Sequence, residues 1–210
     1  MVILKLFSYT FFAALVGVIP PGLVNMTVAK TCLERGKRNG IIVAIGASFT
    51  VIFQALIAII LSKRIFKEKW MYEAILNGGF VIFTLLATYF FIKAYKRSSQ
   101  KKIKLSKHGS TRSFFKGVMI SAFNILPIPY FCAIATAINS RGLINFNTQN
   151  ILYFICAAAL GTYATLHFYA YIFLKIEVNE QKFARNSNYL MSGLMGILMI
   201  ITAIRIFNNI

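Results

Sequence analysis

The sequence predicts an all-α membrane protein with six transmembrane helices in an inverted 3+3 repeat, in which the first and fourth helices are broken. Three observations lead to this fold class. Hydrophobic residues make up 58% of the 210 residues and occur in long runs rather than amphipathic stripes, as in membrane proteins. Prolines interrupt the first and the fourth of these runs. A polar, basic segment near the middle of the chain separates three runs from three.

Six runs can each supply the roughly 20 residues that a helix needs to cross a bilayer. Their residue numbers are 6–29, 41–62, 70–94, 114–138, 151–176 and 189–207. The mean hydropathy of +0.70 agrees with this composition. Because the connections are too short to hold a soluble catalytic domain, we expect residues 1–210 to form a single membrane domain whose function lies within the helices.

The first run contains Pro20, Pro21 and Gly22. Proline lacks a backbone donor and its ring clashes with the preceding turn, so this break frees carbonyl and amide groups that lipid cannot satisfy. Backbone of this kind must line a cavity with protein walls. Helices broken at corresponding places in two halves are typical of secondary transporters, whose substrate site lies near the middle of the membrane. We therefore interpret the chain as a transporter of small solutes.

The second run carries small residues at a spacing of four, among them the row Gly46, Thr50 and Gln54. Such rows let membrane helices approach closely, so packing is their main expected role. Similar rows occur in the fifth run, around Gly161, and in the sixth, around Ser192. The side-chain amide at the end of the first row makes Gln54 a candidate substrate-binding residue.

The third run begins with a carboxylate, Glu73, one turn before Asn77 and just inside Trp70 and Tyr72. The two aromatic residues are typical of the membrane–water interface. Glu73 is a candidate for proton coupling. The interpretation that carries more weight is that it is a solvated carboxylate at the interface.

A basic linker, residues 96–113, joins the two expected pseudo-repeats, residues 1–95 and 114–210. Because each half has an odd number of spans, a duplicated half must insert with opposite orientation. The connections after the first, third and fifth runs, with the adjoining run ends, hold 16 of the 23 Lys and Arg residues. The positive-inside rule makes that side cytoplasmic and both termini external, with a five-span or reversed arrangement as the alternative.

The fourth run contains Pro127 and Pro129, and its Asn124 lies three residues from Pro127, as Asn25 lies three residues from Gly22. An amide offers two donor hydrogens and two acceptor sites. Asn25 and Asn124 can therefore hold the carboxylate and ammonium of a substrate, or replace the backbone partners that the breaks remove. The two roles are equally consistent with the sequence.

The fifth run includes His167 within apolar sequence. Ionisable groups inside a membrane are costly and usually functional, and histidine titrates near physiological pH. His167 is thus the leading candidate for a proton relay, with a neutral histidine sharing a hydrogen bond with another helix as an equal alternative.

Residues 16–40 resemble the N-terminal signature of the LysE/RhtB superfamily of amino-acid exporters, and the fourth run resembles its second signature. In that family a helix-breaking Pro-Gly-Pro is followed by an asparagine and a basic, glycine-bounded loop, and the fourth span carries a glycine followed by Asn-Pro-Lys. The matching residues are Pro21, Gly22, Asn25, Gly36, Arg38 and Gly40, then Gly117, Asn124 and Pro127. The length, the number of runs and the polar central segment agree, so the resemblance covers essentially the whole chain.

The chain departs from the family pattern at three places. Leu23 replaces the second proline of the first signature, and Ile125-Leu126 replace the Pro-Lys of the second. The family often carries an acidic residue early in its second helix, where this chain has Thr50 and Val51. Because of these departures, the family's substrate class and coupling ion do not carry over directly to this chain.

The resemblance implies a multi-pass protein of the bacterial cytoplasmic (inner) membrane that exports amino acids or related small metabolites, driven by the proton-motive force. One half would rock against the other around a substrate site at Pro21, Gly22, Asn25, Gln54, Asn124 and Pro127. We expect a small-molecule substrate and the lipid bilayer as partners, and no cofactor or metal. A homodimer is plausible for so small a bundle.

Composition argues against other classes of protein. The chain has no Asp and five acidic residues, lacks HExxH and GxSxG motifs, and scatters Cys32, Cys132 and Cys156 without metal-ligand spacing, so we do not expect an enzyme. His108 lies in the basic linker, which leaves one histidine in the runs and speaks against haem. The net charge of +18 lies between the runs and does not indicate nucleic acid. A non-transporting accessory subunit, an exporter of a non-amino-acid metabolite and a channel remain as alternatives.

Overall fold

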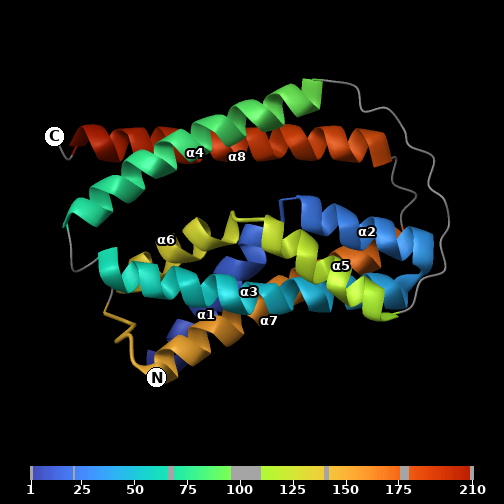
Figure 1. The fold of residues 1–210 in the computed structure, drawn as a ribbon, viewed down its shortest axis with the longest axis horizontal. Helices are drawn as coiled ribbons and strands as arrows, with labels where there is room; N and C mark the ends of the chain where they lie inside the picture. The colour runs from blue at the N-terminus through green and yellow to red at the C-terminus, as the bar shows by residue number, and fades with distance from the viewer. Residues whose placement is uncertain are drawn as a thin grey trace. The chain divides into compact units, whose positions relative to one another are not determined.

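The computed structural model describes residues 2–20, 22–65, 69–95, 110–139, 142–175 and 180–208, and all regular elements in these residues are helices (Figure 1). The helices are α1 (Val2–Val18), α2 (Leu23–Arg35), α3 (Lys37–Ile65), α4 (Lys69–Tyr95), α5 (Ser110–Phe123), α6 (Pro127–Asn139), α7 (Thr148–Lys175) and α8 (Glu180–Asn208). They form two compact units, which are described separately. Unit 1 contains α1, α2, α3, α5, α6 and α7, and unit 2 contains α4 and α8.

Each of the six predicted runs is helical, and the first and fourth are each divided into two helices, as predicted. Within the described residues, α3, α4 and α7 are each long and apolar enough to cross a membrane. The pairs α1–α2 and α5–α6 supply one further span each if a bent pair counts as one span. The apolar part of α8, Met191–Phe207, is shorter. The chain is therefore a multi-pass membrane protein, and the sixth crossing stays a prediction.

The breaks bend their helices sharply, by 71° between α1 and α2 and by 67° between α5 and α6. The position of the second break differs from the prediction. Its non-helical residues are 124–126, and Pro127 is the first residue of α6 rather than an interruption within a helix. The reason is that the first turn of a helix does not use its amide hydrogens, so Pro127 and Pro129 are tolerated there.

The core of unit 1 lies where α2, α3 and α7 meet. A cluster of buried residues from these three helices consists of Val24, Val28, Cys32, Val43, Ala44, Ala47, Leu166 and Ala170. Most of these side chains are small, which brings the helix backbones close together. Cys32 is a free, buried cysteine within this cluster.

At the turn from α2 to α3, the backbone conformation at Gly36 and the close packing at Gly40 both require glycine. Gly36 has a φ of 84°, and its amide donates to the Cys32 carbonyl over 3.0 Å, which is a left-handed cap at the end of a helix. Gly40 faces the Cys32 side chain so closely that a Cβ atom would overlap the sulfur. The glycine-bounded loop of the sequence thus folds α3 back against α2.

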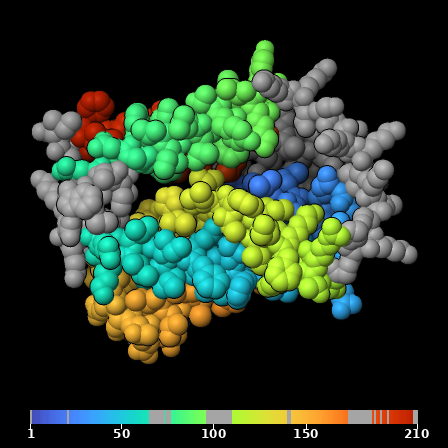
Figure 2. All heavy atoms as spheres, in the orientation of Figure 1, coloured from blue at the N-terminus to red at the C-terminus, as the bar shows by residue number. Residues whose placement is uncertain are grey.

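Close approach between helices is the main packing device of unit 1. A Cβ atom on Gly46 would overlap the Phe114 carbonyl of α5, and one on Gly117 would overlap the Val43 carbonyl of α3. On the other side of the unit, a Cβ atom on Gly161 of α7 would lie 2.5 Å from the Phe11 carbonyl of α1. Figure 2 shows α3 and α5 in contact along one face of the molecule. The predicted packing role of the small-residue rows is confirmed at these positions.

Unit 2 consists of α4 and α8 lying side by side (Figure 1). The Ser192 hydroxyl of α8 donates to the Ala87 carbonyl of α4 over 2.9 Å, and the rings of Phe91 and Tyr189 lie 6.2 Å apart. Only 6% of the most apolar stretch of α4 is buried. An apolar helix surface this exposed is suited to lipid rather than to water.

We expect Gly46→Ala to destabilise the protein by about 1–3 kcal/mol, because the added methyl group forces α3 away from the α5 backbone. The measurement is thermal unfolding of the purified protein in detergent. Gly193→Ala in α8 is the matched control, since no atom lies within 4 Å of the place that its Cβ would take. Equal unfolding temperatures for the two variants would show that the close approach is not needed.

Candidate functional site

At the second break, a single side chain of α3 donates hydrogen bonds to backbone carbonyls at the end of α5. The Gln54 amide nitrogen donates to the carbonyl oxygens of Ser121, over 3.0 Å, and Asn124, over 2.8 Å. Because the helix ends at Phe123, neither carbonyl has the amide donor of a following helical turn, although the Ser121 carbonyl also accepts from the Asn124 backbone amide over 3.0 Å. Gln54 is 5% exposed, so it replaces those partners where water is excluded.

One turn before Gln54, Thr50 makes a second polar contact between α3 and α5. Its hydroxyl lies 3.3 Å from the Val118 carbonyl of α5 and 3.3 Å from the Gly46 carbonyl of its own helix. Gly46 lies a further turn back and faces the Phe114 carbonyl. Three residues on one face of α3 therefore follow the α5 backbone to its end.

At the first break, the freed carbonyls of α1 are closed by α7 and by Asn25. The Asn25 amide donates to the Val18 carbonyl over 2.6 Å, and the Tyr169 hydroxyl of α7 donates to the Ile19 carbonyl. The Asn25 and Tyr169 side chains are also hydrogen-bonded to each other. Asn25 is 4% exposed and bonds the broken backbone, and its contact with a substrate stays a prediction.

The two breaks are closed by the same pattern of contacts. In α7 the Thr165 hydroxyl donates to the Leu15 carbonyl of α1 over 3.0 Å, as Thr50 contacts Val118 in α5. The contacting residues have a spacing of four on both long helices: Gly46, Thr50 and Gln54 on α3, and Gly161, Thr165 and Tyr169 on α7. Each broken helix is thus held by the long helix of the other half of the sequence.

Tyr130 connects the two broken helices directly. It lies in the first turn of α6, and its hydroxyl donates to the Ala13 carbonyl of α1 over 2.6 Å. Its ring occupies the space beside Gly17, where an added Cβ would lie 2.5 Å from the ring. The end of α1 and the start of α6 are therefore joined by one aromatic residue.

Two polar groups at the second break have capacity left for a ligand. The Gln54 carbonyl oxygen is buried and accepts no hydrogen bond from the described part of the chain. The side-chain amide of Asn124, which is half-buried, likewise has no hydrogen bond to the described residues, because only its backbone is bonded. A buried acceptor without a partner costs about 1–3 kcal/mol, so this pair is suited to a ligand that brings its own donor.

The remaining candidate residues add no contact to the pair Gln54 and Asn124. The half-buried His167 ring nitrogen Nδ1 lies 3.3 Å from the Tyr163 hydroxyl on the same helix. Glu73 is exposed on α4 in unit 2. Gly22 is half-buried in the connection between α1 and α2, and Pro21 lies outside the described residues. No group of three or more His, Cys, Asp or Glu side chains in the described ranges could hold a metal ion.

Sequence reasoning did not select Tyr130 and Tyr169, and it placed Thr165 only in a helix-packing row with Gly161. All three bond carbonyls of α1 or of the residue that follows it. A usable signal was present in the shared four-residue spacing, which places a glycine, a threonine and a longer polar side chain on both long helices. No sequence signal marks Tyr130, because its partner is a main-chain carbonyl more than 100 residues away.

Comparison with protein families identifies one match. The model of the family described as LysE type translocator matches residues 15–209. No curated protein and no solved structure shows a comparable match.

Replacing Gln54 by Met should lower the free energy of unfolding by at least about 2 kcal/mol, because the carbonyls of Ser121 and Asn124 lose their shared donor in a buried place. Denaturant or thermal unfolding in detergent measures the loss. Gln149→Met is the matched control, since Gln149 is exposed in the first turn of α7. The interpretation of Gln54 as a backbone closure fails if the two variants are equally stable.

Proposed function

The chain belongs to the LysE type translocator family, and we propose that it is a secondary transporter that exports amino acids or closely related metabolites across the bacterial cytoplasmic membrane. The family is one of transporters rather than enzymes, so the substrate leaves the protein unchanged. The inverted-repeat arrangement of residues 1–95 and 114–210 is part of this proposal. The matched closures of the two breaks support it.

The observation that carries the proposed site is the pair of uncommitted polar groups at the second break. The Gln54 carbonyl oxygen suits an ammonium group, and the Asn124 amide can donate to a carboxylate. The end of α5 and the start of α6 add backbone carbonyls and amides, which favour a cation and an anion respectively. A zwitterion meets complementary partners at such a break without any carboxylate from the protein.

Transport would then require two bodies that move against each other, and the packing supports a particular pair. Because α1 and α2 are held by α7, while α5 and α6 are held by α3, we assign one body to each set of three helices. The buried cluster in which α2, α3 and α7 meet then lies at the boundary between the bodies. The bodies differ from the two halves of the sequence, since each contains a long helix from the other half. Tyr130 joins the bodies beside the first break, so its bond to Ala13 would have to open during the transport cycle.

The proton-motive force is the proposed source of energy. The family resemblance supports this assignment, and His167 is its candidate proton carrier. The His167 ring nitrogen Nδ1 lies 3.3 Å from the Tyr163 hydroxyl, which provides a partner for one of its two nitrogens. Glu73 is the second candidate.

Two alternatives make different predictions for the same measurement. An exporter of another kind of metabolite transports its own solute, but it transports no amino acid from a tested panel. An accessory subunit without transport activity moves no solute after purification and reconstitution. The small-residue contacts fit the accessory subunit equally well, whereas the uncommitted groups of Gln54 and Asn124 favour a transporter.

We expect Asn124→Ala to reduce export at least about tenfold with unchanged stability, because the proposed role of its side chain is to bind the ligand and it has no hydrogen bond to the described residues. Asn25→Ala should reduce both export and stability, because it uncaps the Val18 carbonyl. The measurement is efflux of amino acids from cells loaded with dipeptides, at equal membrane levels of each variant. Unchanged export by both variants would rule out the proposed site.

For coupling, dissipating the pH gradient with nigericin should slow efflux by the unmodified protein, and His167→Asn should remove this sensitivity. The asparagine can keep a hydrogen bond to Tyr163 but cannot carry a proton. If efflux by the His167 variant still depends on the pH gradient, the proton is carried by another group.

A further inference from the structure

A charged cluster lies between α2 and α5 in unit 1, away from the two breaks along the chain. Its members are Lys30, Glu34 and Arg35 of α2 and Lys116 of α5. Glu34 is the one acidic residue among the described residues of unit 1. Three cations therefore share a single carboxylate, in a protein region that otherwise carries few charges inside its helices.

Direct contacts hold the cluster together across the two helices. The Lys30 ammonium lies 3.6 Å from the Glu34 carboxylate, and the Lys116 ammonium donates to the Thr31 hydroxyl over 3.2 Å. Lys116 is half-buried and within electrostatic range of Arg35, Glu34 and Lys30. The cluster thus joins the two bodies that we assigned above, since α2 and α5 belong to different bodies.

Two atoms of adjacent residues in this cluster are buried without a hydrogen bond from the described part of the chain. One is the Glu34 oxygen Oε1, which has only the long ion pair to Lys30, and the other is the Arg35 nitrogen Nε. The first is an acceptor that prefers a cation, and the second is a donor that prefers an anion. Buried charged groups are normally satisfied, so these two call for a partner.

We propose that this cluster is a binding site for a free α-amino acid, distinct from the pair Gln54 and Asn124 at the second break. The ligand ammonium binds Glu34 in place of Lys30, and the ligand carboxylate binds Arg35 and Lys116. The site selects molecules that carry both charges, because an ammonium alone meets three cations and a carboxylate alone leaves Glu34 unmatched. This inference rests on the proposed export function and specifies its substrate class.

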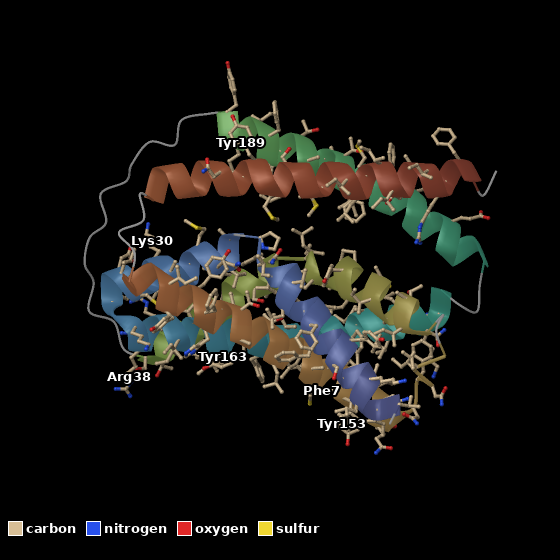
Figure 3. All side chains as sticks on the ribbon, turned by 180° about the vertical axis from the view of Figure 1, so that it is seen from behind. Phe7, Lys30, Arg38, Tyr153, Tyr163 and Tyr189 are labelled. Carbon is tan, nitrogen blue, oxygen red and sulfur yellow. The ribbon has the colours of Figure 1, made fainter. Side chains whose placement is uncertain are left out.

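Access and position support a loading role for the site. The Lys30 side chain is 48% exposed and that of Glu34 is 12% exposed, so the cluster is open to water on the Lys30 side. Figure 3 shows Lys30 and Arg38 at the end of unit 1 opposite to Phe7 and Tyr153. The basic loops place this end in the cytoplasm by the positive-inside rule. An exporter takes up its substrate from that side.

The contact between the broken helices nearer the first break has no charge. There α6 meets α1 through the Tyr130 hydroxyl and the Ala13 carbonyl. A charged site at the α2–α5 contact and a neutral contact between α1 and α6 would make the two directions of transport unequal. Loading by charge recognition and release across neutral groups are suited to export.

Uptake into inside-out membrane vesicles tests the site, because the cytoplasmic end then faces the medium. The probes are the twenty proteinogenic L-amino acids, their 2-hydroxy-acid analogues, which lack the ammonium, and their α-amides, which lack the carboxylate. We expect the unmodified protein to prefer amino acids over both analogues. Glu34→Gln should raise KM for amino acids about tenfold or more and remove discrimination against hydroxy acids. Lys116→Met should also raise KM for amino acids and should remove discrimination against the α-amides.

The ratio of kcat/KM values for the amino acid and its analogue separates a ligand contact from a structural role. A variant that only folds less well lowers uptake of all probes in proportion and leaves this ratio unchanged. Arg112→Gln, on the exposed face of α5 one turn before Lys116, is the matched control and should keep the ratio of the unmodified protein.

A further variant should change KM for amino acids in the opposite direction. Lys30→Gln removes the group that competes with the ligand ammonium for Glu34, so KM for amino acids should fall several-fold. Unchanged ratios in Glu34→Gln and Lys116→Met, or a rise in KM in Lys30→Gln, would overturn the site while leaving the export function in place. If the unmodified protein takes up none of the probes, the proposed export of amino acids fails, and this inference fails with it.

Discussion

The structure depends on one constraint, which is that backbone carbonyls freed by a break cannot remain unpaired inside a membrane. All four prolines of the chain lie beside the two breaks, and each break exposes carbonyls where lipid offers no donor. Side chains of the long helices provide the missing donors. Gln54 bonds two carbonyls at the end of α5, and Thr165 and Tyr169 bond carbonyls at the end of α1. The positions of α3 and α7 follow from this requirement.

This constraint also explains why small residues accompany the polar ones. A hydroxyl or amide on one helix reaches a carbonyl on another only when the backbones lie close together, and Gly46, Gly117 and Gly161 allow that approach. Because each broken helix is held by the long helix from the other half, the packing links the halves instead of separating them.

Because acidic groups are scarce, the protein groups that the proposed zwitterionic substrate would meet at the breaks are mostly neutral. Amides, hydroxyls and backbone groups dominate at the breaks, where their partial charges can serve a zwitterion without the desolvation cost of a buried ion. Fixed charges are gathered at the contact of α2 with α5, where Glu34 is shared by three cations. A substrate that carries opposite charges can be recognised first by fixed charges and then by dipoles, which allows it to be released.

The sequence by itself determined the helical membrane fold, the six apolar regions, the presence of both breaks and the family, because hydrophobic run length and proline are local properties of the chain. It also identified Asn25 and Asn124 as polar residues beside those breaks, and Gln54 as a side-chain amide in the second apolar region. Only the tertiary structure decided that Asn25 bonds the Val18 carbonyl, that Gln54 bonds the carbonyls of Ser121 and Asn124, and that Pro127 starts α6. It alone brought Tyr130 to α1 and Lys116 to α2, since these contacts join residues about a hundred positions apart and no local pattern encodes such pairing.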